Sequence, residues 1–243
     1  MKNYKFEIIL AYYKRPKIVL NALESILKSS YDNWHLTFID DSGDDSFEKF
    51  LFSFGFDNTK ITYKPIMMSD DQKNEIGGST HGEYMNEAIK KSNSDIIIIL
   101  CDDDAFSHDY MENLNSFFNK NPNEMWAYSH VKFFNPDKEH YTQSKEVCEN
   151  ISLNKVNLNA NFLPINPYCR VDSAQVVFKR EAYVKKNIWY PSPATINLDA
   201  YIFNKMFLAW GNCMFTGFFG QNKGWFENQL GVRHRAGKGD FIK

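Results

Sequence analysis

Ile96-Ile97-Ile98-Ile99-Leu100-Cys101-Asp102-Asp103-Asp104 is the stretch that decides the fold. Its aliphatic half predicts a strand buried on both faces, which is the pattern of a parallel sheet. A buried strand cannot hold adjacent charges, so we expect the three carboxylates just past its carboxyl end. Ligands of open α/β sheets bind at that edge. The stretch therefore predicts an α/β fold with a binding site at Asp102, Asp103 and Asp104.

The three adjacent carboxylates indicate a metal site, because they repel one another unless a cation or a hydrogen-bond donor offsets their charge. Carboxylates hold the hard cations Mg²⁺ and Mn²⁺ well, and in proteins these ions often also bind a phosphate. The triplet thus favours a metal-dependent enzyme that acts on a phosphorylated donor. The alternative is a solvated acidic turn in which Asp104 or Ser107 caps the next helix.

The first half of the chain alternates strand and helix signals around this stretch. We expect strands at 6–11, 36–39, 61–64 and 96–100, helices at 16–27, 46–54, 84–92 and 109–119, and a polar loop at 69–82. Such repeated strand–helix–strand winding predicts a doubly wound, mostly parallel sheet flanked by helices.

The second half is less regular. We expect strands at 125–134 and 174–178, helices at 180–186 and 198–210, and polar loops with a short hairpin at 135–165. Gly211 is a suitable C-cap for the last helix. The stretch 231–243 carries Arg233, His234 and Arg235 among glycines, which predicts a flexible cationic tail.

A second acidic cluster follows the second predicted strand, at Asp40 and Asp41. The carboxyl ends of parallel strands meet at one edge, so we expect this cluster beside Asp102–Asp104. Carboxylates accept hydrogen bonds from the N–H and hydroxyl groups of a base or a sugar. One cluster can therefore hold a metal while the other binds an organic ligand. The alternative for 40–45 is a polar turn.

Composition excludes several classes of function. The formal net charge is −2, and no run of lysine or arginine suggests nucleic acid as a partner. We find no signal peptide and no apolar run approaching about 18 residues, so we expect no transmembrane segment. The four cysteines lie far apart without a CxxC pair, which argues against zinc and disulfides and favours the cytoplasm.

Several motifs together resemble family 2 glycosyltransferases of the GT-A fold, of the SpsA-like kind. The opening strand and turn, the first helix, the VDDGSxD segment, the approach to the metal motif and the DXD motif of that family match 6–15, 22–31, 38–45, 84–97 and 100–104. A weaker match runs through 170–176 to 197–200, a region that carries the catalytic base in that family. The basic residue often found ahead of the Asn86 segment is missing, since Thr80 or His81 stands there.

The resemblance implies roles for the donor side. Asp41 should receive the nucleotide base, with Ala11 and Tyr13 forming the wall beside it. Asp102 and Asp103 should lie at the ribose and the metal, and Asp104 is an equally suitable metal ligand. The implied cofactor is Mn²⁺ or Mg²⁺, and the implied donor is a nucleotide diphosphate sugar, a UDP-sugar first of all.

The resemblance also implies an inverting hexosyltransferase-like enzyme of polysaccharide biosynthesis. Asp199 should be the general base, with Asp172 as the alternative, although Asp199 also suits the first turn of a helix. Arg233, His234 and Arg235 are either a lid over the diphosphate or a solvated tail. The acceptor should be a glycan or a lipid-linked glycan, which leaves peripheral contact with a membrane open.

We therefore expect a single domain over 1–243, with a nucleotide-sugar-binding half at 1–120, an acceptor-side half at 121–230 and the tail at 231–243. Two other functions stay open. A sugar-phosphate nucleotidyltransferase usually has a glycine-rich loop after its first strand, whereas Tyr12-Tyr13-Lys14-Arg15-Pro16 contains no glycine. A non-catalytic nucleotide-sugar-binding domain would not need both acidic clusters and Asp199.

Overall fold

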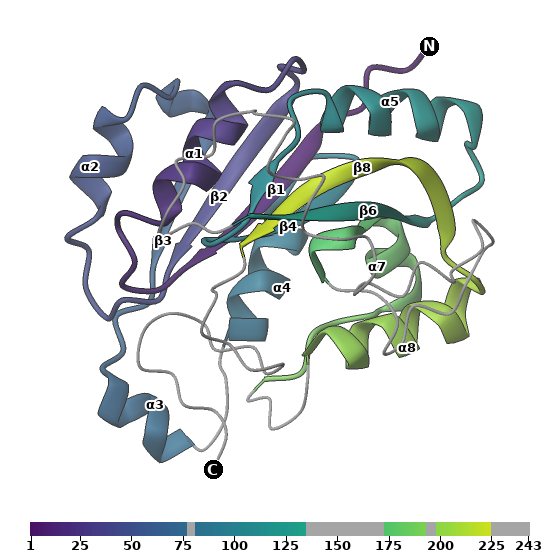
Figure 1. The fold of residues 1–243 in the computed structure, drawn as a ribbon. Helices are drawn as coiled ribbons and strands as arrows, with labels where there is room; N and C mark the ends of the chain where they lie inside the picture. Colours follow the sequence, from purple (N-terminus) through teal and green to yellow (C-terminus); the bar gives the residue numbers. More distant parts are fainter. Residues whose placement is uncertain (77–80, 135–172, 193–197, 225–243) are drawn as a thin grey trace.

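An eight-stranded sheet forms the centre of the molecule, with strand order β3-β2-β1-β4-β7-β6-β8-β5 (Figure 1). The computed structural model describes residues 1–76, 81–134, 173–192 and 198–224. The strands are β1 (Phe6–Tyr12), β2 (Trp34–Asp40), β3 (Ile61–Pro65), β4 (Ile96–Cys101), β5 (Ala105–Phe106), β6 (Trp126–Phe134), β7 (Val176–Lys179) and β8 (Met214–Gly224). The helices are α1 (Val19–Leu27), α2 (Glu48–Ser53), α3 (Asp70–Ile76), α4 (His81–Lys91), α5 (Tyr110–Lys120), α7 (Arg180–Lys186) and α8 (Leu198–Trp210), with short 3₁₀ turns at Asn58–Lys60 and Ser173–Gln175.

Four parallel strands, β3-β2-β1-β4, make the half of the sheet that comes first in the sequence. Tyr12 of β1 pairs with Asp40 of β2, and Ala11 pairs with Cys101 of β4. The carboxyl ends of these three strands are therefore level. The register brings Asp41 and the Asp102–Asp104 triplet to one edge of the sheet, as the sequence predicts.

Helices cover both faces of the sheet (Figure 1). One core cluster joins α1, α2 and α5 to the strand residues Phe6, Ile8 and Leu10. The other joins α4, α7 and α8 to the alternate residues, such as Ile9 and Ile97. Successive residues of a strand point to opposite faces, so an unbroken aliphatic strand serves both cores at once. The expected doubly wound α/β architecture is confirmed.

The second half adds strands of both directions. β7 is antiparallel to β4 and β6, whereas β8 runs parallel to β6. The short β5 pairs with the end of β8 directly after the aspartate triplet. The sequence pattern did not predict β5 or β8. In the described part of the chain, no helix is long and apolar enough to cross a membrane.

The expected loop at 69–82 is wrong, because α3 occupies Asp70–Ile76 and α4 already begins at His81. The reason is a capping box. The Ser69 amide donates to Gln72 Oε1 at 2.8 Å, and the Gln72 amide donates to Ser69 Oγ at 3.3 Å. Asp70 and Asp71 lie in the first turn, where the helix dipole favours negative charge. α3 has no buried residue, which is why hydrophobic periodicity does not reveal it.

Candidate functional site

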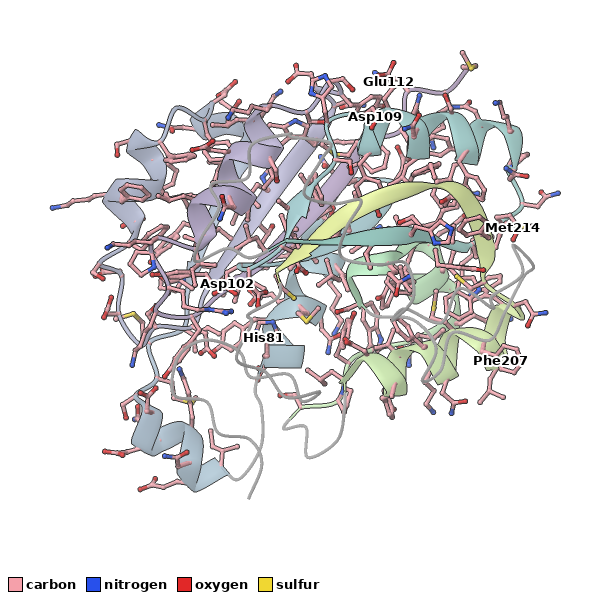
Figure 2. All side chains as sticks on the ribbon, in the orientation of Figure 1. His81, Asp102, Asp109, Glu112, Phe207 and Met214 are labelled. Carbon is pink, nitrogen blue, oxygen red and sulfur yellow. The ribbon has the colours of Figure 1, made fainter. Side chains whose placement is uncertain are left out.

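The carboxyl edge of β1, β2 and β4 gathers charged side chains from segments far apart in the sequence. Figure 2 labels Asp102 at this end of the strands, near His81 at the start of α4, while Asp109 and Glu112 lie at the opposite end. Asp102, Asp103 and Asp104 form the tight connection between β4 and β5, in which the Asp104 amide donates to the Cys101 carbonyl at 3.1 Å. Gln221 of β8 donates to the Ile99 carbonyl at 3.0 Å and helps to cover this connection.

Arg15, from the turn after β1, is the counter-ion of the triplet. Its Nε donates to Asp102 Oδ2 at 3.0 Å, and its Nη2 bonds the other Asp102 oxygen. Its Nη1 lies 3.3 Å from Asp103 Oδ2. The fork geometry of a guanidinium suits such a two-oxygen contact. The Tyr13 amide adds a further hydrogen bond to Asp102 at 3.2 Å.

Burial raises the pKa of the Asp102 carboxyl to about 6, although Arg15 opposes this shift. Only 3% of Asp102 is exposed, and the neighbouring Asp103 carboxylate raises the pKa further. Strongly perturbed carboxyl groups of this kind gather at functional sites.

Cys101, Asp103 and Asp104 could hold a metal ion, because their ligand atoms all lie within 4.8 Å of one another. Asp103 is 9% exposed and Asp104 is fully buried. The structure thus brings together the two aspartates predicted as metal ligands and adds a thiol. The single thiol makes the set less hard than carboxylates alone, but carboxylate oxygens remain the majority and suit Mn²⁺ or Mg²⁺.

The two aspartates after β2 differ in their surroundings. Asp40 is fully buried and accepts hydrogen bonds from Tyr63 Oη at 2.7 Å and from the Ser42 amide at 2.9 Å, so its oxygens hold the turn together. Asp41 is partly exposed, and its Oδ1 forms an ion pair with Lys73 Nζ at 2.8 Å. Asp41 is therefore the member of the pair that a ligand can reach.

Tyr13 stands beside Asp41 and is bordered by α3. Lys73 Nζ lies 5.2 Å from the centre of the Tyr13 ring, and the Tyr13 hydroxyl donates to Asp70 at 3.1 Å. Lys14 bonds the other oxygen of Asp70 at 2.9 Å. Burial, with the Asp70 bond next, raises the pKa of Tyr13. Ala11 is half-buried and pairs with Cys101, so the predicted wall residues and both acidic clusters share one edge.

Asp199 lies in the first turn of α8 and is half-buried. Its side of the sheet follows from the core cluster that α8 shares with Tyr190. Burial raises the pKa of Tyr190, and the charges of Asp199 and Cys101 both raise it further. Burial also raises the pKa of Tyr183, with Asp199 among the smaller causes. Tyr190 and α8 belong to the core cluster that also contains Met85, Ala88 and Ile89 of α4, so the predicted base lies on the α4 side of the sheet.

Three residues of the site have no role in the sequence-based predictions. Arg15 and Lys73 neutralise the two acidic clusters, and Cys101 joins the candidate metal set. Arg15 could have been found because it follows the first predicted strand, at the same edge as the triplet. Lys73 could not, because its segment reads as a loop. The predicted lid of Arg233, His234 and Arg235, and the alternative base Asp172, lie outside the described residues.

Comparison with solved structures shows the same fold. TarS from S. aureus, residues 1–349, superposes with a TM-score of 0.66 at 14% sequence identity, covering 90% of this chain and 60% of TarS. The same TarS fragment in complex with UDP-GlcNAc gives a TM-score of 0.64 at 12% identity, covering 93% of this chain and 60% of that one. The TarS fragment in complex with UDP gives a TM-score of 0.62 at 13% identity, covering 91% of this chain and 60% of that one. The chain thus spans about 60% of the length of the TarS fragment.

Comparison with protein sequences gives the family. None of the curated protein sequences compared with the chain matches it significantly. The family model described as "Glycosyl transferase family 2" matches residues 7–215, which include all but the first residue of β1, both acidic clusters and Asp199. This match confirms the resemblance seen in the motifs, and the chain belongs to glycosyltransferase family 2.

Proposed function

We propose that this protein is an inverting, metal-dependent glycosyltransferase that moves a sugar from a UDP-sugar to a hydroxyl group of a glycan or lipid-linked glycan. The observation that carries the proposal is the meeting of Asp41, Tyr13 and the Asp102–Asp104 triplet at one sheet edge. The choice of nucleotide is supported by TarS, whose structures contain UDP-GlcNAc and UDP.

The donor's nucleoside would lie along the edge between the two acidic clusters. Asp41 accepts a hydrogen bond from the base, which exchanges for part of its ion pair with Lys73. Tyr13 packs against the base, and Ala11 leaves room for it. Asp102 would accept hydrogen bonds from the ribose hydroxyls, which exchange for part of its contact with Arg15. Arg15 is also a cation available to the diphosphate, since it contacts both Asp102 and Asp103.

Asp103 and Asp104 are the proposed ligands of Mn²⁺ or Mg²⁺, with Cys101 beside them. The fit rests on two carboxylates that face each other closely in a site nearly closed to solvent. When bound, such an ion supplies Lewis-acid stabilisation of the negative charge on the departing diphosphate.

Asp199 is the proposed general base. It takes the proton from the acceptor hydroxyl as that oxygen bonds to the anomeric carbon, while the bond from that carbon to the diphosphate breaks with its electron pair. Attack on the face opposite the leaving group inverts the configuration. The core cluster that α8 shares with α4 and Tyr190 supports a base on this side of the molecule.

The two halves of the chain and its tail have separate proposed roles. We assign donor binding to 1–120 and the acceptor side to 121–230, with Arg233, His234 and Arg235 in the tail as a lid over the diphosphate. We place the enzyme in the cytoplasm, in polysaccharide biosynthesis. The wide spacing of the four cysteines supports a reducing compartment.

A donor screen tests the proposal. UDP-, GDP-, CMP- and dTDP-sugars are added with Mn²⁺, and both the melting temperature and nucleotide release are measured, because a ligand of the native state raises apparent stability. We expect UDP-sugars to stabilise the protein and to be turned over. Stabilisation without turnover on any acceptor would indicate a binding domain. Pyrophosphate release from a nucleoside triphosphate and a sugar phosphate would indicate a nucleotidyltransferase.

A further inference from the structure

The Asn86 side chain of α4 forms two hydrogen bonds with the main chain of Tyr190, in the acceptor-side half. Asn86 Nδ2 donates to the Tyr190 carbonyl at 2.8 Å, and the Tyr190 amide donates to Asn86 Oδ1 at 2.8 Å. The two residues are 104 positions apart in the sequence. Both polar groups of one peptide segment are thus held by a single side-chain amide, which fixes the position and the direction of that segment.

Gly82 lies one turn before Asn86 and lets the same segment come close to α4. A Cβ atom at Gly82 would lie 2.5 Å from the Pro191 carbonyl oxygen and 2.9 Å from Tyr190 Cβ. Such distances are below any normal carbon contact, so only glycine fits while the segment stays in place. Gly82 and Asn86 together form a docking surface for Tyr190 and Pro191, which we call the α4 clamp.

The α4 clamp holds Tyr190, which lies between α4 on the donor side and α8 with the proposed base Asp199. The Tyr190 hydroxyl is buried and lies 3.3 Å from the Tyr183 hydroxyl. Tyr190 packs in the same core cluster as Leu198, Ile202 and Phe203 of α8, the helix whose first turn carries Asp199. A few residues further along the chain, α8 begins with Leu198 and Asp199. A shift of Tyr190 therefore changes the surroundings of Asp199.

We propose that Asn86 is a positioning residue for sugar transfer, which fixes Asp199 relative to the donor edge by holding the Tyr190 main chain. The inference rests on the proposed function, in which Asp199 is the base. α4 leads directly into β4 and its aspartate triplet, so the clamp joins the donor side to the acceptor side through one rigid helix. A misplacement of about 1 Å at a reacting group can cost on the order of 10²-fold in rate.

The chain offers a matched control. Asn119 makes the same reciprocal pair with Lys2, because the Lys2 amide donates to Asn119 Oδ1 at 2.7 Å and Asn119 Nδ2 donates to the Lys2 carbonyl at 2.8 Å. Asn119 lies near the end of α5, and this helix starts at the opposite end of the strands from Asp102, where Figure 2 labels Asp109 and Glu112. Asn119→Ala thus removes the same kind of interaction without touching the site.

The experiment compares wild type, Asn86→Ala and Asn119→Ala by UDP binding in calorimetry, by release of UDP from the UDP-sugar that wild type turns over, and by hydrogen exchange. For Asn86→Ala we expect kcat lower by about 10²-fold, UDP affinity within about twofold, and faster exchange at the Tyr190 amide and in the first turn of α8. Asn119→Ala should match wild type in all three. Gly82→Ala, which pushes the segment away with Asn86 intact, should reproduce Asn86→Ala.

Unchanged kcat in Asn86→Ala, or UDP affinity that falls in step with kcat, would overturn the inference while the proposed function stands. If Asn86→Ala does not fold, Asn86→Asp, which keeps the acceptor for the Tyr190 amide, takes its place under the same criteria. If wild type turns over no nucleotide sugar, the proposed function fails. Hydrogen exchange of Asn86→Ala then tests whether the α4 clamp holds this segment. Unchanged exchange at the Tyr190 amide and along α8 would overturn the clamp, and faster exchange would support it.

Discussion

At the scale of single residues, neighbouring carboxylates take different roles because their surroundings differ. Asp40 and Asp102 are almost completely buried and are held by Tyr63 and Arg15 respectively. Asp41 is partly exposed beside Lys73. The sequence shows that these positions are acidic. Only the fold shows which carboxylates already accept hydrogen bonds from buried protein groups.

Asp41→Ala should weaken UDP binding by roughly 10- to 100-fold, since a hydrogen bond to a charged group contributes about 1.5–3 kcal/mol. The protein should still fold, because Asp41 is partly exposed and Asp40 keeps the turn in place. Calorimetry with UDP measures the affinity. Asp44→Ala, in the same acidic turn but fully exposed, is the control and should bind as wild type does. Equal affinities of Asp41→Ala and wild type for UDP would refute the base-binding role.

Glu7 is the buried carboxylate at the other end of the sheet, and its role is structural. It is 2% exposed and accepts hydrogen bonds from Thr37 at 2.7 Å, Ser92 at 2.6 Å and Ser94 at 3.2 Å, and it pairs with His35 at 2.8 Å. Its oxygens thus tie β1 to β2 and to the turn before β4.

Glu7→Ala should lower the free energy of unfolding by about 3 kcal/mol, because several buried donors lose their acceptor. Glu7→Gln keeps the shape and should cost less. Urea denaturation measures both. Glu24→Ala removes an exposed pair with Lys28 on α1 and should change stability by no more than about 0.5 kcal/mol. A loss for Glu7→Ala as small as that of Glu24→Ala would show that the network contributes little.

At the scale of elements, the strands and most helices follow from pattern, whereas polar elements do not. The aliphatic run of β4 and the apolar faces of α1 and α5 are visible in the sequence because each faces a core. α3 faces no core, and only the Ser69–Gln72 capping box marks it. The contacts that assemble the site are longer in range, from Arg15 to Asp102 and from Asn86 to Tyr190, and no local pattern encodes them.

α8 places Asp199 in its first turn, anchored by buried Ile202, Phe203 and Met206 behind it. Asp199→Asn keeps this packing, so UDP affinity should not change. The rate of transfer should fall by roughly 10²–10⁴-fold, the usual contribution of a positioned base. Steady-state kinetics with the turned-over UDP-sugar measures the rate. A near-normal rate for Asp199→Asn together with a collapsed rate for Asp172→Asn would move the role of base to Asp172.

At the scale of the whole molecule, one sheet carries two cores and one functional edge. The parallel strands β3-β2-β1-β4 present the acidic clusters, while β7, β6 and β8 extend the sheet. β8 also pairs with β5 directly after the aspartate triplet. α4 and α8 lie on the same face and belong to one core cluster, so the donor edge and the proposed base share a rigid support.

The most direct measurement is the turnover of a UDP-sugar by wild type and by Asp103→Ala and Asp104→Ala, with Mn²⁺ present and after exhaustive chelation. We expect release of UDP only by wild type and only with Mn²⁺ or Mg²⁺, because the two carboxylates are the proposed ligands and the departing diphosphate needs its charge stabilised. Full turnover after chelation, or in both variants, would contradict a metal-dependent transfer at this edge of the sheet.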